Sequence, residues 1–343
     1  MVTDLNKIFA IIFVLAVLFS GCAIPNETEN ELTIYTYDSM ISEYGLGPKV
    51  IPIFEEQCNC KVNVIAKGDA GQLLSTLILE KDSPKADLVI GIDNSLFHKA
   101  TESGVLEKFT PSNINLVSKD LRFDDEGYLT PYDYGFIAFV YDSEKITTSL
   151  DGFDSLLNPE LKKKIVIQNP RSSSPGLALL FWSIEVYGDP GYKEFWEEFK
   201  PNVLIVTNGW DESAGLFSAG EAPIYLSYAT SPPYYAEFEG INHYLAAEFK
   251  EGHYLQIEGT GIVKGTKKRE LAEKFIEFTL EKEFQQEIPF HQFMFPVNSK
   301  IEFPQAFIDY AINPATKLEL ESSLIYEKQE EWILEWEKIM TSE

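Results

Sequence analysis

The hydrophobic positions in the first part of the chain alternate between strand-like runs and helical patterns. Three nearly continuous apolar runs, rich in β-branched residues, predict buried strands: LTIYTY (32–37), KVNVIA (61–66) and DLVIGI (87–92). Between these runs, apolar residues recur with helical spacing, at positions 50, 51, 53 and 54 and again at 73, 74, 77 and 78. This alternation predicts β-α-β units with a parallel sheet.

The same alternation starts again after a long apolar segment. Residues 128–142, YLTPYDYGFIAFVYD, contain no tight turn and are long enough to cross from one lobe to another. A helix is predicted from Pro175 to Tyr187, with Ser174 as its N-cap and Gly188 as its stop. Further strands are predicted at 164–169, 203–208 and 223–229.

A second crossing segment is predicted at residues 252–263, GHYLQIEGTGIV. One long helix is predicted after it, at 267–288, and another at 322–340. Two α/β lobes joined by two crossings are typical of a receptor that binds its ligand in a cleft. We therefore assign residues 32–130 and 260–343 to a discontinuous lobe 1, and residues 131–259 to lobe 2.

The N-terminus has the pattern of a secretory leader. A lysine precedes an apolar run from Ile8 to Phe19, which is shorter than the roughly 20 residues that span a bilayer. The run ends in Ser-Gly-Cys, the ending that a lipoprotein signal peptidase accepts. We expect residues 1–21 to be a signal peptide, Cys22 to carry a lipid anchor, and residues 22–31 to form a tether outside the cytoplasm.

Charge and cysteine content narrow the possible functions. The 343 residues carry a formal charge of −26, which argues against nucleic-acid binding because that requires basic patches. Cys58 and Cys60 can pair in an oxidising compartment, although a bridge across one residue is strained. The four histidines are scattered without ligand spacing, so no metal site is predicted.

The residues that follow the predicted strands are mostly acidic and aromatic. They include Tyr37, Asp69, Asp93 and Trp210, and the run LSYATSPPYY adds further tyrosines after the strand at 223–229. Aromatic faces attract cations, each contact contributing about 1 kcal/mol, and carboxylates complete the charge. This set predicts a small, planar, cationic ligand. The serines of PRSSSPG, just before a helix, offer a position for a polar or phosphorylated tail.

Several motifs, in this order, resemble one known family: YTYDS, DLVIGIDN, PYDYGFIAFVYD, NPRSSSPGLALLFW, NGWDESAGLF, LSYATSPPYY, EGHYLQIE and FMFPV. The chain is similar, from about Leu32 to its C-terminal helix, to the thiamine-binding proteins of bacterial thiamine ABC importers. The resemblance implies a type II periplasmic-binding-protein fold, α/β in class, with two lobes, a ligand cleft and two hinge crossovers.

The resemblance also implies a function and a set of site residues. The protein would be a monomer without cofactor or catalytic activity that captures thiamine and its phosphates and delivers them to a permease and ATPase complex. The ligand-binding residues carried over from the family are Tyr37, Asp69, Ser173, Trp210, Tyr228, Tyr234 and Phe293. Phe293 stands where the family has a tryptophan, a stronger cation-π partner, and KGDAG departs from the family's acidic pair before glycine.

Three alternative functions compete with this interpretation. Adjacent Tyr234 and Tyr235 resemble the paired tyrosines of ferric-ion receptors of the same fold. A thiaminase-like enzyme would need a nucleophilic cysteine in the cleft, but Cys58 and Cys60 precede the strand at 61–66 and so lie at its amino end. A purely structural cell-surface module would bind no small cation.

Overall fold

The computed structural model describes residues 30–342. The predicted signal peptide, the predicted anchor Cys22 and most of the predicted tether lie outside the described residues. Residues 32–342 belong to one compact unit. Within the described residues, no helix combines the length and the apolar character needed to cross a membrane.

A mixed β-sheet runs through this unit in the order β2-β1-β3-β10-β5-β8-β6-β7. The strands β1 and β3 pair in parallel, as do β6 and β7, and β6 and β8. The bounds of these strands are β1 (Glu31–Thr36), β2 (Lys61–Ala66), β3 (Leu88–Asp93), β5 (Thr130–Asp142), β6 (Ile165–Gln168), β7 (Val203–Thr207), β8 (Ile224–Tyr228) and β10 (His253–Val263).

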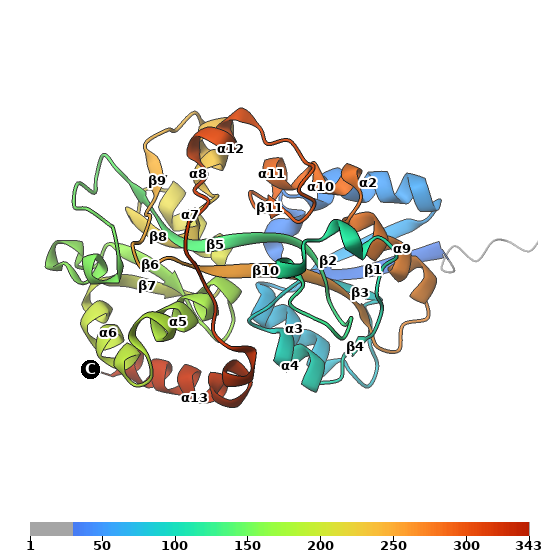
Figure 1. Cartoon of the computed structure of the whole chain (residues 1–343), viewed down its shortest axis with the longest axis horizontal. Coiled ribbons are helices and arrows are strands. Elements are labelled where there is room, and N and C mark those ends of the chain that lie inside the picture. The colour runs from blue at the N-terminus through green and yellow to red at the C-terminus, as the bar shows by residue number, and fades with distance from the viewer. Residues whose placement is uncertain (1–29, 343) are drawn as a thin grey trace, which may run out of the picture. The chain divides into compact units, whose positions relative to one another are not determined.

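Two long antiparallel strands, β5 and β10, join the two parallel sets (Figure 1). The first half of β5 pairs with β10, and its second half pairs with β8. The strand β10 continues past β5 to pair with β3. The two predicted crossing segments therefore form strands that run between the lobes. Short strands pair along them: β4 (Leu106–Glu107), β9 (Tyr244–Ala246), β11 (Phe295–Pro296) and β12 (Lys317–Leu318).

The helix predicted from Pro175 is confirmed, and it begins one residue earlier than expected. Helix α5 (Ser174–Tyr187) has Ser173 at its N-cap and ends at Gly188, whose φ of 72° suits glycine. The other helices are α2 (Gly47–Cys58), α3 (Ala70–Leu79), α4 (Phe97–Glu102), α6 (Gly191–Phe199), α7 (Trp210–Ser218), α8 (Pro232–Tyr234), α9 (Arg269–Thr279), α10 (Lys282–Gln285), α11 (Ile288–His291), α12 (Gln305–Tyr310) and α13 (Ser322–Thr341).

The single helix predicted for residues 267–288 is wrong. The segment is split into α9 and α10, with the start of α11 at its end, because Glu281 adopts an extended backbone conformation. The Gln285 side chain donates to the carbonyl of Thr279 at 2.7 Å and to that of Tyr132 at 2.8 Å. The buried Gln285 amide thus satisfies the Thr279 carbonyl, which a continuous helix would have paired, and its second bond, to Tyr132, is a tertiary contact that helical periodicity does not reveal.

The C-terminal helix α13 packs on helices of the predicted second lobe. Trp336 contacts the ring of Trp196 on α6 with centroids 5.6 Å apart, and Trp332 contacts Phe181 on α5 at 5.9 Å. Lys193 of α6 also lies 3.4 Å from Glu335. The lobe boundaries drawn from the sequence stay a prediction, and these contacts link α13 to the elements between residues 131 and 259.

Candidate functional site

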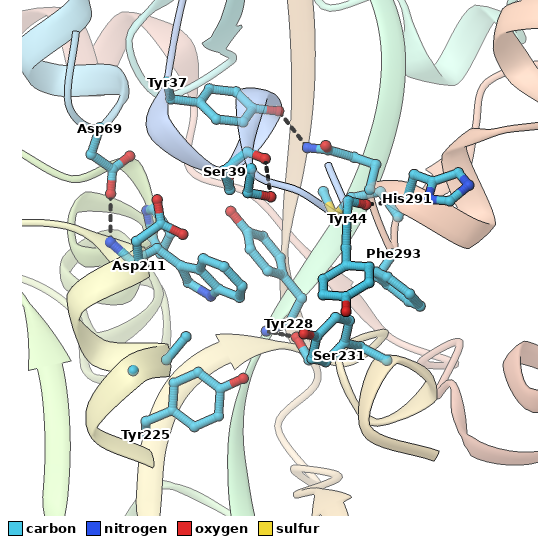
Figure 2. Close-up of a pocket in the computed structure, with 18 of the residues that line it drawn as sticks. Tyr37, Ser39, Tyr44, Asp69, Asp211, Tyr225, Tyr228, Ser231, His291 and Phe293 are labelled. Atoms are coloured by element: carbon cyan, nitrogen blue, oxygen red, sulfur yellow. Dashed lines mark hydrogen bonds between the residues drawn. The ribbon is translucent and has the colours of Figure 1, made fainter. Parts of the chain in front are cut away.

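A cavity of about 290 Å³ lies at the carboxyl ends of several strands, near the lower end of the range of about 300–1,000 Å³ for small-molecule sites. Figure 2 shows Tyr37, Asp69, Tyr228 and Phe293 around one space. The predicted site residues that line it are Tyr37, Asp69, Trp210, Tyr228, Tyr234 and Phe293. Ser173 is buried as the N-cap of α5 and does not line the cavity, whereas the next residues, Ser174 and Pro175, do.

Asp69 joins two elements that are distant in sequence. As the N-cap of α3, it accepts a hydrogen bond from the backbone N–H of Ala70 at 2.7 Å through Oδ1. Its other oxygen accepts from the backbone N–H of Trp210, the first residue of α7, at 2.8 Å (Figure 2). Burial raises the pKa of Asp69, and the hydrogen bond from Ala70 opposes that rise. One carboxylate therefore caps α3 and occupies the positive end of α7.

Trp210 is held as a wall of the cavity. Its indole N–H donates to the Ser227 hydroxyl at 2.8 Å, and that hydroxyl lies 2.7 Å from the hydroxyl of Ser231. The indole therefore has its polar atom satisfied and leaves its face to the cavity. The other four tryptophans are at most 3% exposed and none of them lines the cavity.

The segment LSYATSPPYY builds a second aromatic wall. The strand β8 ends at Tyr228, whose hydroxyl accepts from Gln256 Nε2 at 2.8 Å. Two prolines then start α8, which continues as a π-helix over Tyr235–Glu239, a feature frequent at functional sites. Tyr234 meets the ring of Phe293 edge to face, with centroids 5.3 Å apart.

Phe293 is held in an uncommon backbone conformation. Its φ of 54° lies in the left-handed region, which non-glycine residues rarely adopt. Its backbone N–H donates to the carbonyl of Ile288 at 3.0 Å, which fixes this turn at the end of α11. The chain thus maintains a strained position that brings Phe293 to the cavity.

The sequence analysis missed Glu258, the carboxylate at the centre of the site. It lies on β10, is 6% exposed and lines the cavity. The hydroxyls of Tyr37 and Tyr132 both donate to its Oε2, that of Tyr37 at 2.8 Å. Gln256 Nε2 donates to Oε1 at 3.3 Å. A charged residue inside the apolar run HYLQIEGTGIV was the available signal, because buried charges require dedicated partners.

Asp133 lies on β5 directly opposite Glu258. It is fully buried, and neither of its carboxylate oxygens has a hydrogen-bond partner among residues 30–342. Burial raises the pKa values of both carboxyl groups, and the charge of Glu258 raises that of Asp133 further. Because only Glu258 receives hydrogen bonds, we assign the negative charge of the pair to Glu258 and a proton to Asp133.

Asp211 adds a third carboxylate to the cavity wall, after Asp69 and Glu258. Burial, and then the charges of Asp38 and Asp69, raise its pKa to about 6. Among the described residues, no lysine or arginine lines the cavity. The site therefore combines aromatic faces with carboxylates and is electrostatically suited to a cation. Tyr44, His291 and Gln292 also line it, and no sequence pattern at these positions pointed to the site.

The structure also bears on the thiaminase-like enzyme and the ferric-ion receptor as alternatives. Cys58 and Cys60 form a disulfide next to the start of β2, so neither is a free nucleophile, and neither lines the cavity. The hydroxyl of Tyr235 lies 2.9 Å from that of Tyr225, and the rings of Tyr234 and Tyr235 are nearly perpendicular. The Tyr235 hydroxyl is therefore already hydrogen-bonded to Tyr225 within the cavity wall.

Comparisons with known proteins support the fold. Residues 83–313 match the family described as bacterial extracellular solute-binding protein. The thiamine-binding periplasmic protein of Salmonella typhimurium is 38% identical over 320 residues, covering 93% of this chain and 96% of that protein. A solved structure of a periplasmic thiamin binding protein superposes with a TM-score of 0.85 at 36% identity, covering 91% of this chain and 96% of that chain. These matches confirm the predicted α/β fold with two lobes.

Ferric-ion receptors share the fold at a greater distance. The ferric binding protein from Campylobacter jejuni superposes with a TM-score of 0.75 but is only 22% identical, over 90% of this chain and 99% of that chain. At that identity the likeness extends to the fold alone.

Proposed function

The chain belongs to the bacterial extracellular solute-binding proteins, the family that matches most of its length, and we propose that it captures thiamine in the cavity lined by Trp210, Tyr228 and Phe293. The observation that carries this proposal is the pairing of aromatic walls with the buried carboxylate of Glu258. Thiamine has a cationic thiazolium ring and a flat aminopyrimidine ring. The first suits aromatic faces and carboxylates, and the second can stack on an aromatic wall.

Phosphate esters of thiamine would find weaker complementarity in this cavity. No lysine or arginine lines it among the described residues, and the N-terminus of α7 is already occupied by the Asp69 carboxylate. The N-terminus of α5 offers little more, because the backbone N–H of Ser174 helps to lower the pKa of Asp69 and Pro175 has no N–H to donate. We therefore expect the phosphate groups to add little to the affinity for thiamine.

In this proposal the protein acts outside the cytoplasm as the receptor of an ABC importer. The loaded protein would deliver thiamine to a permease and its ATPase, as a monomer and without chemical conversion of the ligand.

We propose that cleavage before Cys22 and lipidation of that residue hold the protein at the membrane. The substitution Cys22→Ser should then release the protein into the soluble extracytoplasmic fraction, whereas Cys58→Ser should not. Equal membrane retention of both variants would argue against the anchor.

The first test of ligand and site is a titration of residues 31–343 with thiamine, followed by intrinsic tryptophan fluorescence. We expect saturable quenching, because Trp210 is the only one of the five tryptophans that lines the cavity. Trp210→Ala and Asp69→Asn should each weaken binding by about 1–3 kcal/mol, measured by calorimetry because the first variant also removes the fluorophore.

Two controls separate this result from unfolding and from the alternatives. Asp82→Asn, which alters an exposed carboxylate away from the cavity, should bind as the unaltered chain does. Ferric citrate and spermidine should leave the fluorescence unchanged. A response to iron alone would move the site to Tyr234 and Tyr235, and unaltered affinity in both cavity variants would refute the assignment of the site.

Thiamine affinity should depend on pH through Asp211. Its raised pKa of about 6 means that the group is ionised above that pH and becomes neutral below it. A bound cation stabilises the ionised form, so affinity should be highest above pH 6 and fall, by up to about tenfold, as the pH drops to 5. In Asp211→Asn, the decrease in thiamine affinity near pH 6 should disappear, because the group that titrates there is absent. Calorimetry between pH 5 and 8 measures both proteins, and identical profiles would contradict the role of Asp211.

Phe293 should limit the strength of the cation-π contact. Replacing it with tryptophan should tighten thiamine binding by about 0.5–1 kcal/mol, since the indole face attracts cations more strongly. The matched control is Phe290→Trp, at a partly exposed position that does not line the cavity. A similar gain in both variants, or weaker binding by Phe293→Trp, would show that Phe293 does not face the cation.

A further inference from the structure

A second cluster of polar side chains lies outside the cavity, at the end of β5. One ligand atom each from Asp142, Glu144 and His243 lies within 4.8 Å of the other two. The His243 Nε2 atom is 3.8 Å from Asp142 Oδ1 and 3.9 Å from Glu144 Oε2. Among residues 30–342, this is the only group of three or more histidine, cysteine or acidic side chains with such spacing. None of the three lines the cavity.

The separations of these atoms are close to those that a metal ion requires. Ligand atoms about 2.0–2.1 Å from a tetrahedral zinc ion lie about 3.4 Å apart. The distances from His243 to the two carboxylates exceed this value by about 0.4–0.5 Å, and the three ligand atoms lie within 4.8 Å of one another, so the carboxylates would need to close in on the ion. Exposed side chains make such a shift readily, and the side chains of Glu144 and His243 are 74% and 31% exposed.

The backbone that carries the cluster is fixed. Asp142 pairs with Tyr244 where β5 meets β9 (Figure 1). The carbonyl of His243 accepts hydrogen bonds from the Ser143 N–H at 3.0 Å and from its hydroxyl at 2.8 Å. The Glu144 N–H in turn donates to Asp142 Oδ1 at 3.0 Å. These bonds fix the backbone that carries the three side chains before any ion arrives, which reduces the entropic cost of binding.

The charge at the cluster favours a cation. The Asp142 side chain is only 6% exposed, and besides His243 it pairs with Lys145, whose Nζ lies 3.2 Å from Oδ2. Lys145 is half exposed and contacts the oxygen that does not face His243, so it can turn into solvent when an ion binds. An imidazole with two carboxylates suits zinc and similar transition metals better than calcium or magnesium, which prefer oxygen ligands alone.

We propose that Asp142, Glu144 and His243 form a binding site for a divalent transition-metal cation, with Zn²⁺ as the natural probe. Water would complete the coordination on the exposed side. The ion would join the end of β5 to the segment before β9 and stabilise that edge of the sheet. The sequence analysis did not predict the site, because His243 is far from Asp142 along the chain and only the pairing of β5 with β9 unites them.

The test is calorimetry of residues 31–343, dialysed against a chelator, with ZnCl₂ at pH 7.5. We expect one Zn²⁺ per chain and a rise in the melting temperature on addition of the ion. His243→Ala and Glu144→Gln should each weaken binding at least tenfold and reduce that rise, and Lys145→Ala should strengthen binding. Glu144 is exposed, so Glu144→Gln keeps the test valid if His243→Ala fails to fold. CaCl₂ and MgCl₂ should bind much more weakly.

The matched control is His98→Asn, since His98 lies outside the cluster. It should bind Zn²⁺ as the unaltered chain does. Absence of saturable binding at micromolar Zn²⁺, or equal binding by the unaltered chain, His243→Ala and Glu144→Gln, would overturn the proposal. The affinity for thiamine should be the same with and without chelator. Loss of zinc binding and loss of thiamine binding are therefore separate outcomes.

Discussion

The antiparallel pairing of β5 with β10 is the constraint on which the rest of the structure depends. It links the parallel strands of both lobes, and it places Asp133 opposite Glu258, which lines the cavity. The same strands position Gln256 next to Tyr228. A change of register by one residue would turn these side chains to the other face of the sheet and remove Glu258 from the cavity. The fold and the electrostatics of the cavity therefore share one set of backbone hydrogen bonds.

Hydrogen bonds from the protein itself offset the cost of burying Glu258. Two tyrosine hydroxyls and the Gln256 amide donate to its carboxylate, so the charge is held in place before a ligand arrives. Fixed acceptors need little reorganisation when a cation enters, which is the advantage of a preformed polar site. The proton assigned to Asp133 follows from the same arrangement, because two unshielded charges side by side in the interior would be far more costly.

Local patterns predicted much of the fold, and six of the seven site residues named from the sequence and the family resemblance line the cavity. Continuous apolar runs identified the crossing strands, and the Ser-Pro start and Gly188 stop identified α5 to within one residue. Several cavity residues were predicted because they follow strands, and the topology brings the carboxyl ends of those strands together. The break at Glu281 depends on Gln285, whose amide also donates to the carbonyl of Tyr132 on β5, and the role of Glu258 depends on two tyrosines. No pattern along the chain encodes those contacts.

Asp69 explains why a site built at helix N-termini selects cations. The first N–H groups of a helix normally attract anions, and α7 offers such a terminus at Trp210. Here the chain supplies its own anion, because Asp69 accepts the Trp210 N–H while capping α3. The local potential at the end of α7 is thereby neutralised, and Asp211 and Glu258 then make the cavity negative. Without Asp69, the same backbone would present an unpaired donor to the cavity and favour a ligand of the opposite charge.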